Sequence, residues 1–142
     1  MTIATILVSK GHEVISVTAR QSVAEGVSAL AERRIGALPV MDGDEVVGIF
    51  SERDVIHAIN AHGAAALGRT IGEVMTAPAI TVGPDEPAIG ALSLMTRRRV
   101  RHLPVIEKGV VIGVVSIGDL VKYRIDRIEA DAEAMRSYIQ SA

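Results

Sequence analysis

The chain has 142 residues, of which 49% are hydrophobic, 23% charged and only 2% aromatic, as expected for one globular unit with an aliphatic core. With 15 basic and 17 acidic residues its formal charge is -2, so we expect no nucleic-acid partner and no attraction to an anionic membrane surface. The absence of cysteine excludes disulfides, thiolate catalysis and metal sites built from thiolates. No apolar run approaches the roughly 18 residues of a membrane span, and the N-terminus lacks signal-peptide features. We therefore expect a soluble, cytoplasmic protein.

Residues 14–55 and 79–120 repeat each other at a constant offset of 65 residues without a gap. Twelve of the 42 aligned pairs are identical. The identities cluster around one stretch of each copy, and include Leu38/Leu103, Pro39/Pro104, Val40/Val105, Gly48/Gly113, Ser51/Ser116 and Asp54/Asp119. This concentration indicates an internal duplication rather than a shared composition.

Each copy predicts a strand, a helix, a β-hairpin and a second helix, in that order. Short β-branched runs indicate the first strands. Helix starts are marked by a capping box at Ser22 and Glu25 in the first copy and by Pro87 in the second, and two apolar runs around a turn indicate each hairpin. The expected strands and hairpins occupy residues 14–17, 37–41 and 46–50 in the first copy, and 80–82, 103–106 and 110–115 in the second, and the second helices start at Ser51 and Ser116.

The predicted fold is α/β (α+β), with two β-α-β-β-α units packed about a pseudo-twofold axis and an additional C-terminal helix. The expected boundaries are 1–62 for the first repeat, 63–69 for an Ala- and Gly-rich linker, 70–122 for the second repeat and 123–142 for the helix. Residues 70–73 are expected to begin a short helical turn that ends near Met75.

In each copy a Ser at the end of the last strand is followed three residues later by an Asp: Ser51 with Asp54, and Ser116 with Asp119. On the first turn of a helix these positions lie on one side, so a hydroxyl and a carboxylate face the same space beside free backbone N–H groups. The N–H groups and the hydroxyl suit a phosphate, whereas the carboxylate suits the vicinal hydroxyls of a ribose. The alternative is that both residues only cap the helix, since Ser-x-x-Asp approximates a capping box. Their recurrence in register favours a nucleotide site.

Around these turns the sequence resembles a tandem pair of cystathionine-β-synthase (CBS) domains, over about residues 3–122. The motifs that carry the resemblance are IGALPV at 35–40, GIFSERD at 48–54, IGEVMT at 71–76, VRHLPV at 100–105 and GVVSIGD at 113–119. The first copy enters less typically, with Leu7 where Met75 stands and three more residues before Val17.

The resemblance implies a regulatory module with two clefts for adenosyl ligands: AMP, ATP or NAD(H), with S-adenosylmethionine the least favoured. It implies that Asp54 and Asp119 bind ribose and that Ser51 and Ser116 approach phosphate. The remaining implied ligand contacts are Ser16, Val17, Thr81 and Val82 at the adenine, Ala37 and His102 through backbone, and Arg101 and His102 as basic phosphate ligands. The first copy has Gly36 and Ala37 in place of this basic pair, so phosphate binding beside Asp54 requires Arg53 or another arginine (Arg33, Arg34 or Arg99) to reach in.

Other functional classes find less support. No motif of a hydrolase elbow, a phosphate-binding loop or a dinucleotide-binding loop occurs, so we expect no enzyme. The four histidines are scattered, and we expect no metal site. The principal alternative is a module that has lost its ligands and serves protein interaction.

Apolar residues in the tail are spaced as in a coiled-coil seam, at steps of 4, 3, 4, 3 and 4: Val121, Ile125, Ile128, Ala132, Met135 and Ile139. A helix of this length is marginal alone in water, so the seam must be buried against another surface. The resemblance implies a homodimer, which this helix would clamp, besides a client protein of unknown identity. The alternative is that the seam packs on its own chain.

Overall fold

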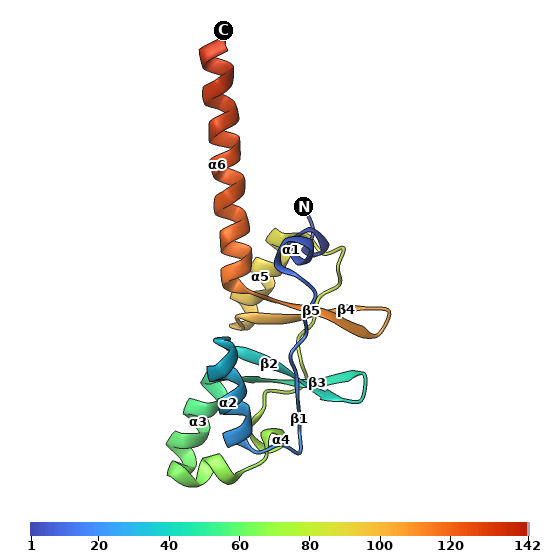
Figure 1. Cartoon of the computed structure of the whole chain (residues 1–142), viewed down its shortest axis with the longest axis vertical. Helices are drawn as coiled ribbons and strands as arrows, with labels where there is room; N and C mark the ends of the chain where they lie inside the picture. The colour runs from blue at the N-terminus through green and yellow to red at the C-terminus, as the bar shows by residue number, and fades with distance from the viewer. Residues whose placement is uncertain (142) are drawn as a thin grey trace.

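The computed structural model describes residues 1–141, and it consists of two similar halves stacked on each other with one long helix rising from the second (Figure 1). The first half contains β1 (Val17–Thr18), α2 (Val23–Arg33), β2 (Ala37–Asp42), β3 (Glu45–Ser51) and α3 (Glu52–His62). A 3-10 segment, η1 (Gly63–Gly68), and the short helix α4 (Ile71–Val74) connect it to the second half. The remaining elements are α1 (Ile3–Lys10), α5 (Ala88–Arg98), β4 (His102–Glu107), β5 (Val110–Ser116) and α6 (Ile117–Ser141).

The two hairpins have the same register, which confirms the predicted duplication. Strands β2 and β3 are antiparallel with Leu38 opposite Phe50, and β4 and β5 are antiparallel with Leu103 opposite Val115. In both hairpins the register shifts at the same position, after Val40 and after Val105. A β-bulge retained in both copies gives the two hairpins the same local twist.

The first strand of each copy is shorter than the sequence predicts. Strand β1 comprises only Val17 and Thr18, paired in parallel with β2, and in the second copy only Val82 bridges to Val105. The residues before Val17 and Val82 cross over from the other half of the molecule, so they lie along the sheet for only one or two residues. The predicted strand residues 14–16, 80 and 81 therefore lie outside the strands.

Each half has its own aliphatic core, and the two halves exchange their entry helices. Leu7 of α1 is fully buried in the core of the second half, while Ile71 of α4 is fully buried in that of the first. A Cβ at Gly113 would lie 2.6 Å from Leu7, and a Cβ at Gly48 would lie 2.7 Å from Met75. Leu7 and Met75 are thus equivalent, as the sequence comparison expects. The exchange places the chain that follows α4 beside the first half.

The predicted C-terminal helix is continuous with the second helix of the second repeat. Helix α6 begins at Ile117, directly after β5, and runs for 25 residues to Ser141. Leu120 is its buried residue, and beyond this base the helix projects away from both halves (Figure 1). Residue 142, which the sequence assigns to the same helix, lies outside the described residues. No helix within residues 1–141 combines the length and apolar character needed to cross a membrane.

Candidate functional site

The turn between β3 and α3 holds Ser51 and Asp54 in reciprocal hydrogen bonds. The Ser51 hydroxyl oxygen accepts from the Asp54 backbone N–H at 3.3 Å, and Asp54 Oδ2 accepts from the Ser51 backbone N–H at 2.8 Å and from its hydroxyl at 3.0 Å. This is the complete capping box that the sequence offered as the alternative. Capping fixes the carboxylate in one orientation, which is compatible with ligand binding.

The second carboxylate oxygen of Asp54 is bound by the segment that follows α4. The Thr76 hydroxyl donates to Asp54 Oδ1 at 2.8 Å, and the backbones of Thr76 and Ile49 exchange two hydrogen bonds of 2.9 Å each. Asp54 is only 9% exposed, and among residues 1–141 no basic side chain forms an ion pair with it. Its negative charge is therefore held in place by neutral donors alone.

Asp54 borders a cavity of about 400 Å³ between the two halves. This volume lies in the range of small-molecule sites, roughly 300–1,000 Å³. The walls come from both copies and from the crossing segment, and comprise Gly36, Ile49, Ser51, Glu52, Arg53, Asp54, Thr76, Pro78, Ala79, Ile80, Arg98, Arg99, Val100, Arg101 and His102. The cavity is thus formed by both copies together with the segment that connects them after α4, and neither copy forms it alone.

Four arginines line the same cavity as Asp54 and give it a basic wall. Arg98 ends α5, Arg99 and Arg101 follow it, and Arg53 comes from α3 of the other half. Arg53 Nη1 donates to the Arg99 backbone carbonyl at 3.3 Å, which ties the two halves together at this wall. Among residues 1–141 these four side chains form no ion pair. Their charge is available to an anionic ligand.

His102, the first residue of β4, lies where the two halves meet. A Cβ on Gly36 would approach the His102 ring to 3.1 Å, so the absence of a side chain at position 36 makes room for the imidazole. Burial lowers the pKa of His102 below its ordinary value, and the charges of Lys10 and Arg101 lower it further against the opposing effect of Asp119 and Glu52. The imidazole is therefore neutral at neutral pH, when it can donate one hydrogen bond and accept another.

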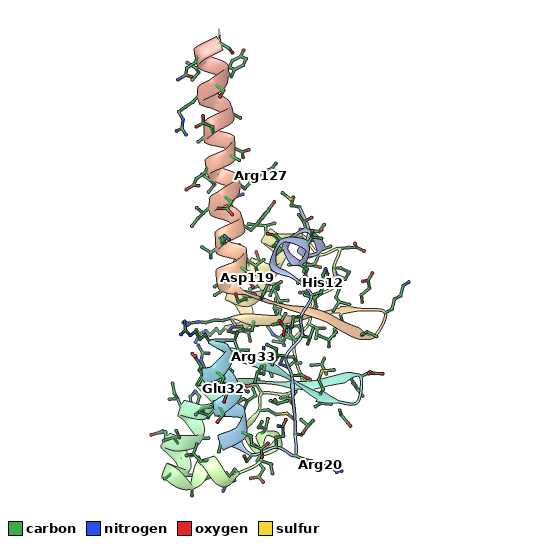
Figure 2. The ribbon with its side chains drawn as sticks, viewed as in Figure 1. His12, Arg20, Glu32, Arg33, Asp119 and Arg127 are labelled. Carbon is green, nitrogen blue, oxygen red and sulfur yellow. The ribbon has the colours of Figure 1, made fainter. Side chains whose placement is uncertain are left out.

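The equivalent turn of the second copy is occupied by a lysine from α1. Asp119 Oδ2 accepts from the Ser116 backbone N–H at 2.8 Å and also from Lys10 Nζ at 2.6 Å. The same ammonium donates to the Val114 backbone carbonyl at 2.6 Å. Asp119 lies at the base of α6 (Figure 2). In the first copy the Thr76 N–H binds the Ile49 carbonyl and the Thr76 hydroxyl binds Asp54. In the second copy the Lys10 ammonium group makes both of the equivalent contacts.

The Lys10–Asp119 pair predicts a pH-dependent contribution to stability. Burial raises the pKa of Asp119, but the hydrogen bond and charge of Lys10 and the bonds from Ser116 outweigh it, so the pKa lies below the ordinary 3.8. A lowered carboxyl pKa stabilises the fold above the unfolded-state value, and this contribution is lost as pH falls through the folded-state value. We expect Lys10→Met to raise the acid-unfolding midpoint followed by circular dichroism. An unchanged midpoint would show that the pair contributes nothing to the fold.

The structure brings five of the predicted site residues into one cavity: Ser51, Arg53, Asp54, Arg101 and His102. Arg101 and His102 line the cavity that Asp54 also lines. They adjoin the Ser116 turn of their own copy as well, because His102 pairs with Ser116 and the Arg101 carbonyl accepts from the Ile117 N–H at 2.8 Å. Arg101 and His102 of the second copy therefore line the same cavity as Gly36 of the first copy.

The other predicted contacts do not line this cavity. Val17, Val82 and Ala37 are buried in the sheets and cores, Ser16 and Thr81 are exposed, and Ser116 and Asp119 form the turn beside Lys10. The sequence did not identify Thr76 or residues 78–80 as cavity walls. The sequence feature that could have indicated Thr76 is the IGEVMT segment, which ends at this residue just before the chain passes to the second half.

These features define a duplicated α/β module with a cleft between its copies that is lined by Glu52, Asp54 and four arginines. The family model of the CBS domain matches residues 7–61 and 71–126, and the chain belongs to this family as a CBS pair.

Relatives support this assignment at the level of the whole chain. The CBS domain-containing protein CBSX3, mitochondrial, of Arabidopsis thaliana is 32% identical over 98% of this chain and 72% of its own length. The crystal structure of the CBS-domain containing protein ATU1752 from Agrobacterium tumefaciens superposes with a TM-score of 0.85 at 35% identity, covering 87% of this chain and 99% of the other. The CBS domain protein PAE2072 from Pyrobaculum aerophilum, whose structure is complexed with AMP, has a TM-score of 0.75 at 25% identity, with 84% and 89% covered.

Proposed function

We propose that the protein is a regulatory module that binds an adenine nucleotide in the cleft beside Asp54 and signals by a change of conformation or association. The observation that carries the proposal is the cleft itself, which is lined by a fixed carboxylate and by four arginines that form no ion pair within residues 1–141. A carboxylate can accept from both hydroxyls of a ribose, and guanidinium groups bind phosphate with strong charge-assisted bonds. The AMP complex of the PAE2072 protein supports the ligand class.

The charge of the basic wall favours AMP, ATP or NAD(H) over S-adenosylmethionine. The first three carry phosphates that would lie against Arg98, Arg99 and Arg101, whereas the sulfonium of S-adenosylmethionine is a cation and would be repelled there. The proposed module acts on a client protein rather than catalysing a reaction, in the cytoplasm.

Thermal unfolding in the presence of each ligand tests the proposal. A nucleotide at about 100 times its Kd adds about 2.7 kcal/mol to the free energy of unfolding, which raises Tm by several degrees. We expect AMP, ATP or NADH to give this shift and S-adenosylmethionine to give less. No shift with any adenosyl ligand, together with no nucleotide in the mass spectrum of the purified protein, would instead favour the module that has lost its ligands.

Replacing Arg101 should weaken ligands in proportion to their phosphate charge. We expect Arg101→Ala to leave adenosine affinity nearly unchanged, to reduce AMP affinity by about tenfold or more and to reduce ATP affinity further, because each charge-assisted hydrogen bond is worth about 1.5–3 kcal/mol. Isothermal titration calorimetry measures the three affinities. Equal losses for adenosine and ATP would show that Arg101 serves the fold.

The two Ser/Asp turns should bind with different affinities because Lys10 already engages Asp119. A ribose at Asp119 must displace a short ion pair, whereas a ribose at Asp54 meets only neutral donors. We therefore expect one tight site per chain, and expect Lys10→Met, which removes the ammonium group from Asp119, to strengthen the weak second site. The stoichiometry measured by calorimetry shows whether one or two nucleotides bind per chain. Two equal sites in the parent protein would contradict this assignment.

The protein is further proposed to act as a homodimer. Apolar residues along α6 have no covering partner within residues 1–141: Val121, Ile125, Ile128, Met135 and Ile139 are 43–65% exposed. The seam does not pack on its own chain, and apolar stripes of this kind are normally buried. The sedimentation of the parent protein tests the proposal, with a dimer expected at micromolar concentration.

A further inference from the structure

The seam of α6 lies on a different face from the one that contacts the body of the protein. Leu120 is buried and Tyr123 packs against the second core, while the seam residues Val121, Ile125 and Ile128 are exposed. Successive residues of a helix are about 100° apart, so the seam faces about 100° away from Leu120 and about 170° away from Tyr123. A second helix can therefore lie along the seam without displacing anything.

The spacing of the seam assigns every residue of the tail to a heptad position. Ile125, Ala132 and Ile139 occupy a positions, and Val121, Ile128 and Met135 occupy d positions. The flanking g positions are Arg124, Asp131 and Tyr138, and the flanking e positions are Lys122, Glu129 and Arg136. In coiled coils the residues at e and g determine the orientation of the partner.

These flanking charges are complementary only when the partner runs in the same direction. In a parallel, in-register pair each g residue faces the e residue five positions later in the other chain, which joins Arg124 to Glu129 and Asp131 to Arg136. Each of these two pairs occurs twice in a symmetric dimer.

An antiparallel pair centred on the same seam brings like charges together. Residues at e then face e, and residues at g face g, so that Glu129 meets its own copy, Asp131 meets its own copy and Lys122 meets Arg136. Like charges across an interface are unfavourable. The existing bonds within α6, from Arg136 to Glu133 at 2.7 Å and from Arg127 to Asp131 at 3.8 Å, join side chains that are at least half exposed and are therefore weak competitors.

We infer that two copies of this chain pair through α6 as a parallel, in-register coiled coil, which places both CBS pairs at the same end of a shared stalk. The inference deepens the proposed homodimer by giving its contact surface, its direction and its register. Because partner helices cross at the seam and the bodies lie to the side of it, the two bodies extend in opposite directions from the stalk.

Cysteine cross-linking distinguishes the two directions, and the chain has no cysteine of its own to interfere. In a parallel pair Ile139→Cys places the two thiols face to face at an a position. In an antiparallel pair residue 139 lies opposite residue 121, about 27 Å along the helix from its own copy. We expect Ile139→Cys in the full chain to form a disulfide dimer under mild oxidation, and the neighbouring outer-face variant Gln140→Cys to form much less.

Sedimentation of both cysteine variants under reducing conditions shows whether a missing cross-link reflects a different helix direction or the absence of a dimer. A protein that is dimeric but does not cross-link at position 139 would overturn the parallel arrangement and leave the homodimer standing. A monomeric parent protein would overturn both.

Charge reversal tests the direction of the paired helices independently of cross-linking. Arg136→Asp puts like charges against Asp131 in a parallel dimer but relieves the repulsion with Lys122 in an antiparallel one. We expect this variant to weaken dimerisation by about fivefold or more, and Asp131→Arg with Arg136→Asp to restore it. Tighter association of Arg136→Asp would identify the antiparallel form and overturn the inference.

Discussion

We expect Asp54→Ala to reduce the affinity for AMP, ATP or NADH by about 10-fold to 150-fold. The carboxylate is 9% exposed and has no basic partner within residues 1–141, so a ribose would supply the donors that complete its hydrogen bonding. Calorimetry with the full chain measures the loss. If this variant bound nucleotide with the affinity of the parent protein, Asp54 would not be a ribose ligand.

The second copy provides a matched control for this variant. Asp119→Ala removes the same capping carboxylate from the equivalent helix, as Asp119 binds the Ser116 backbone N–H just as Asp54 binds that of Ser51. We expect it to destabilise the fold by a similar amount while leaving the tight site intact. If both variants lose nucleotide equally, the loss reports helix capping rather than ligand contact.

The repeat made most of the fold predictable from the sequence. Identical residues in register fixed both hairpins, and the Ser and Asp positions fixed the starts of α3 and α6, since these features depend on local turn and capping chemistry. The first strands were predicted too long because their ends are set by the exchange of α1 and α4 between halves. That exchange is a long-range contact, and no local pattern encodes it.

The residue types of the site were predictable from the sequence, but which of them lie together was not. A carboxylate, a hydroxyl and a basic pair were identified from the sequence. Arg101 was assigned to the site of its own copy, whereas it also lines the cavity of Asp54. Lys10 illustrates the same difficulty. The three additional residues before Val17 were visible in the sequence, but only the longer α1 shows that they carry an ammonium group to Asp119.

Dimerisation should fail when a charge is placed in the seam of α6. Ile128 lies at the centre of the exposed stripe and is 54% exposed in the single chain, so its side chain is free to be buried by a partner. Ile128→Asp would place two unpaired carboxylates in that interface, and an uncompensated buried charge costs about 3–5 kcal/mol. We expect the dimer to weaken by at least about 100-fold, and Met135→Asp to act in the same direction.

Analytical ultracentrifugation across a concentration series measures this loss, with Ala130→Asp as the control. Residue 130 lies on the opposite face of α6 from the seam, so the control adds the same charge to the same helix without entering the interface. A chain ended at Lys122 retains the buried Leu120 but loses the seam beyond Val121, and we expect it to sediment as a monomer with its nucleotide affinity preserved. If Ile128→Asp and the shortened chain both sediment as the parent dimer does, the two copies associate through the CBS pairs themselves, and the exposed seam of α6 is left for the client protein.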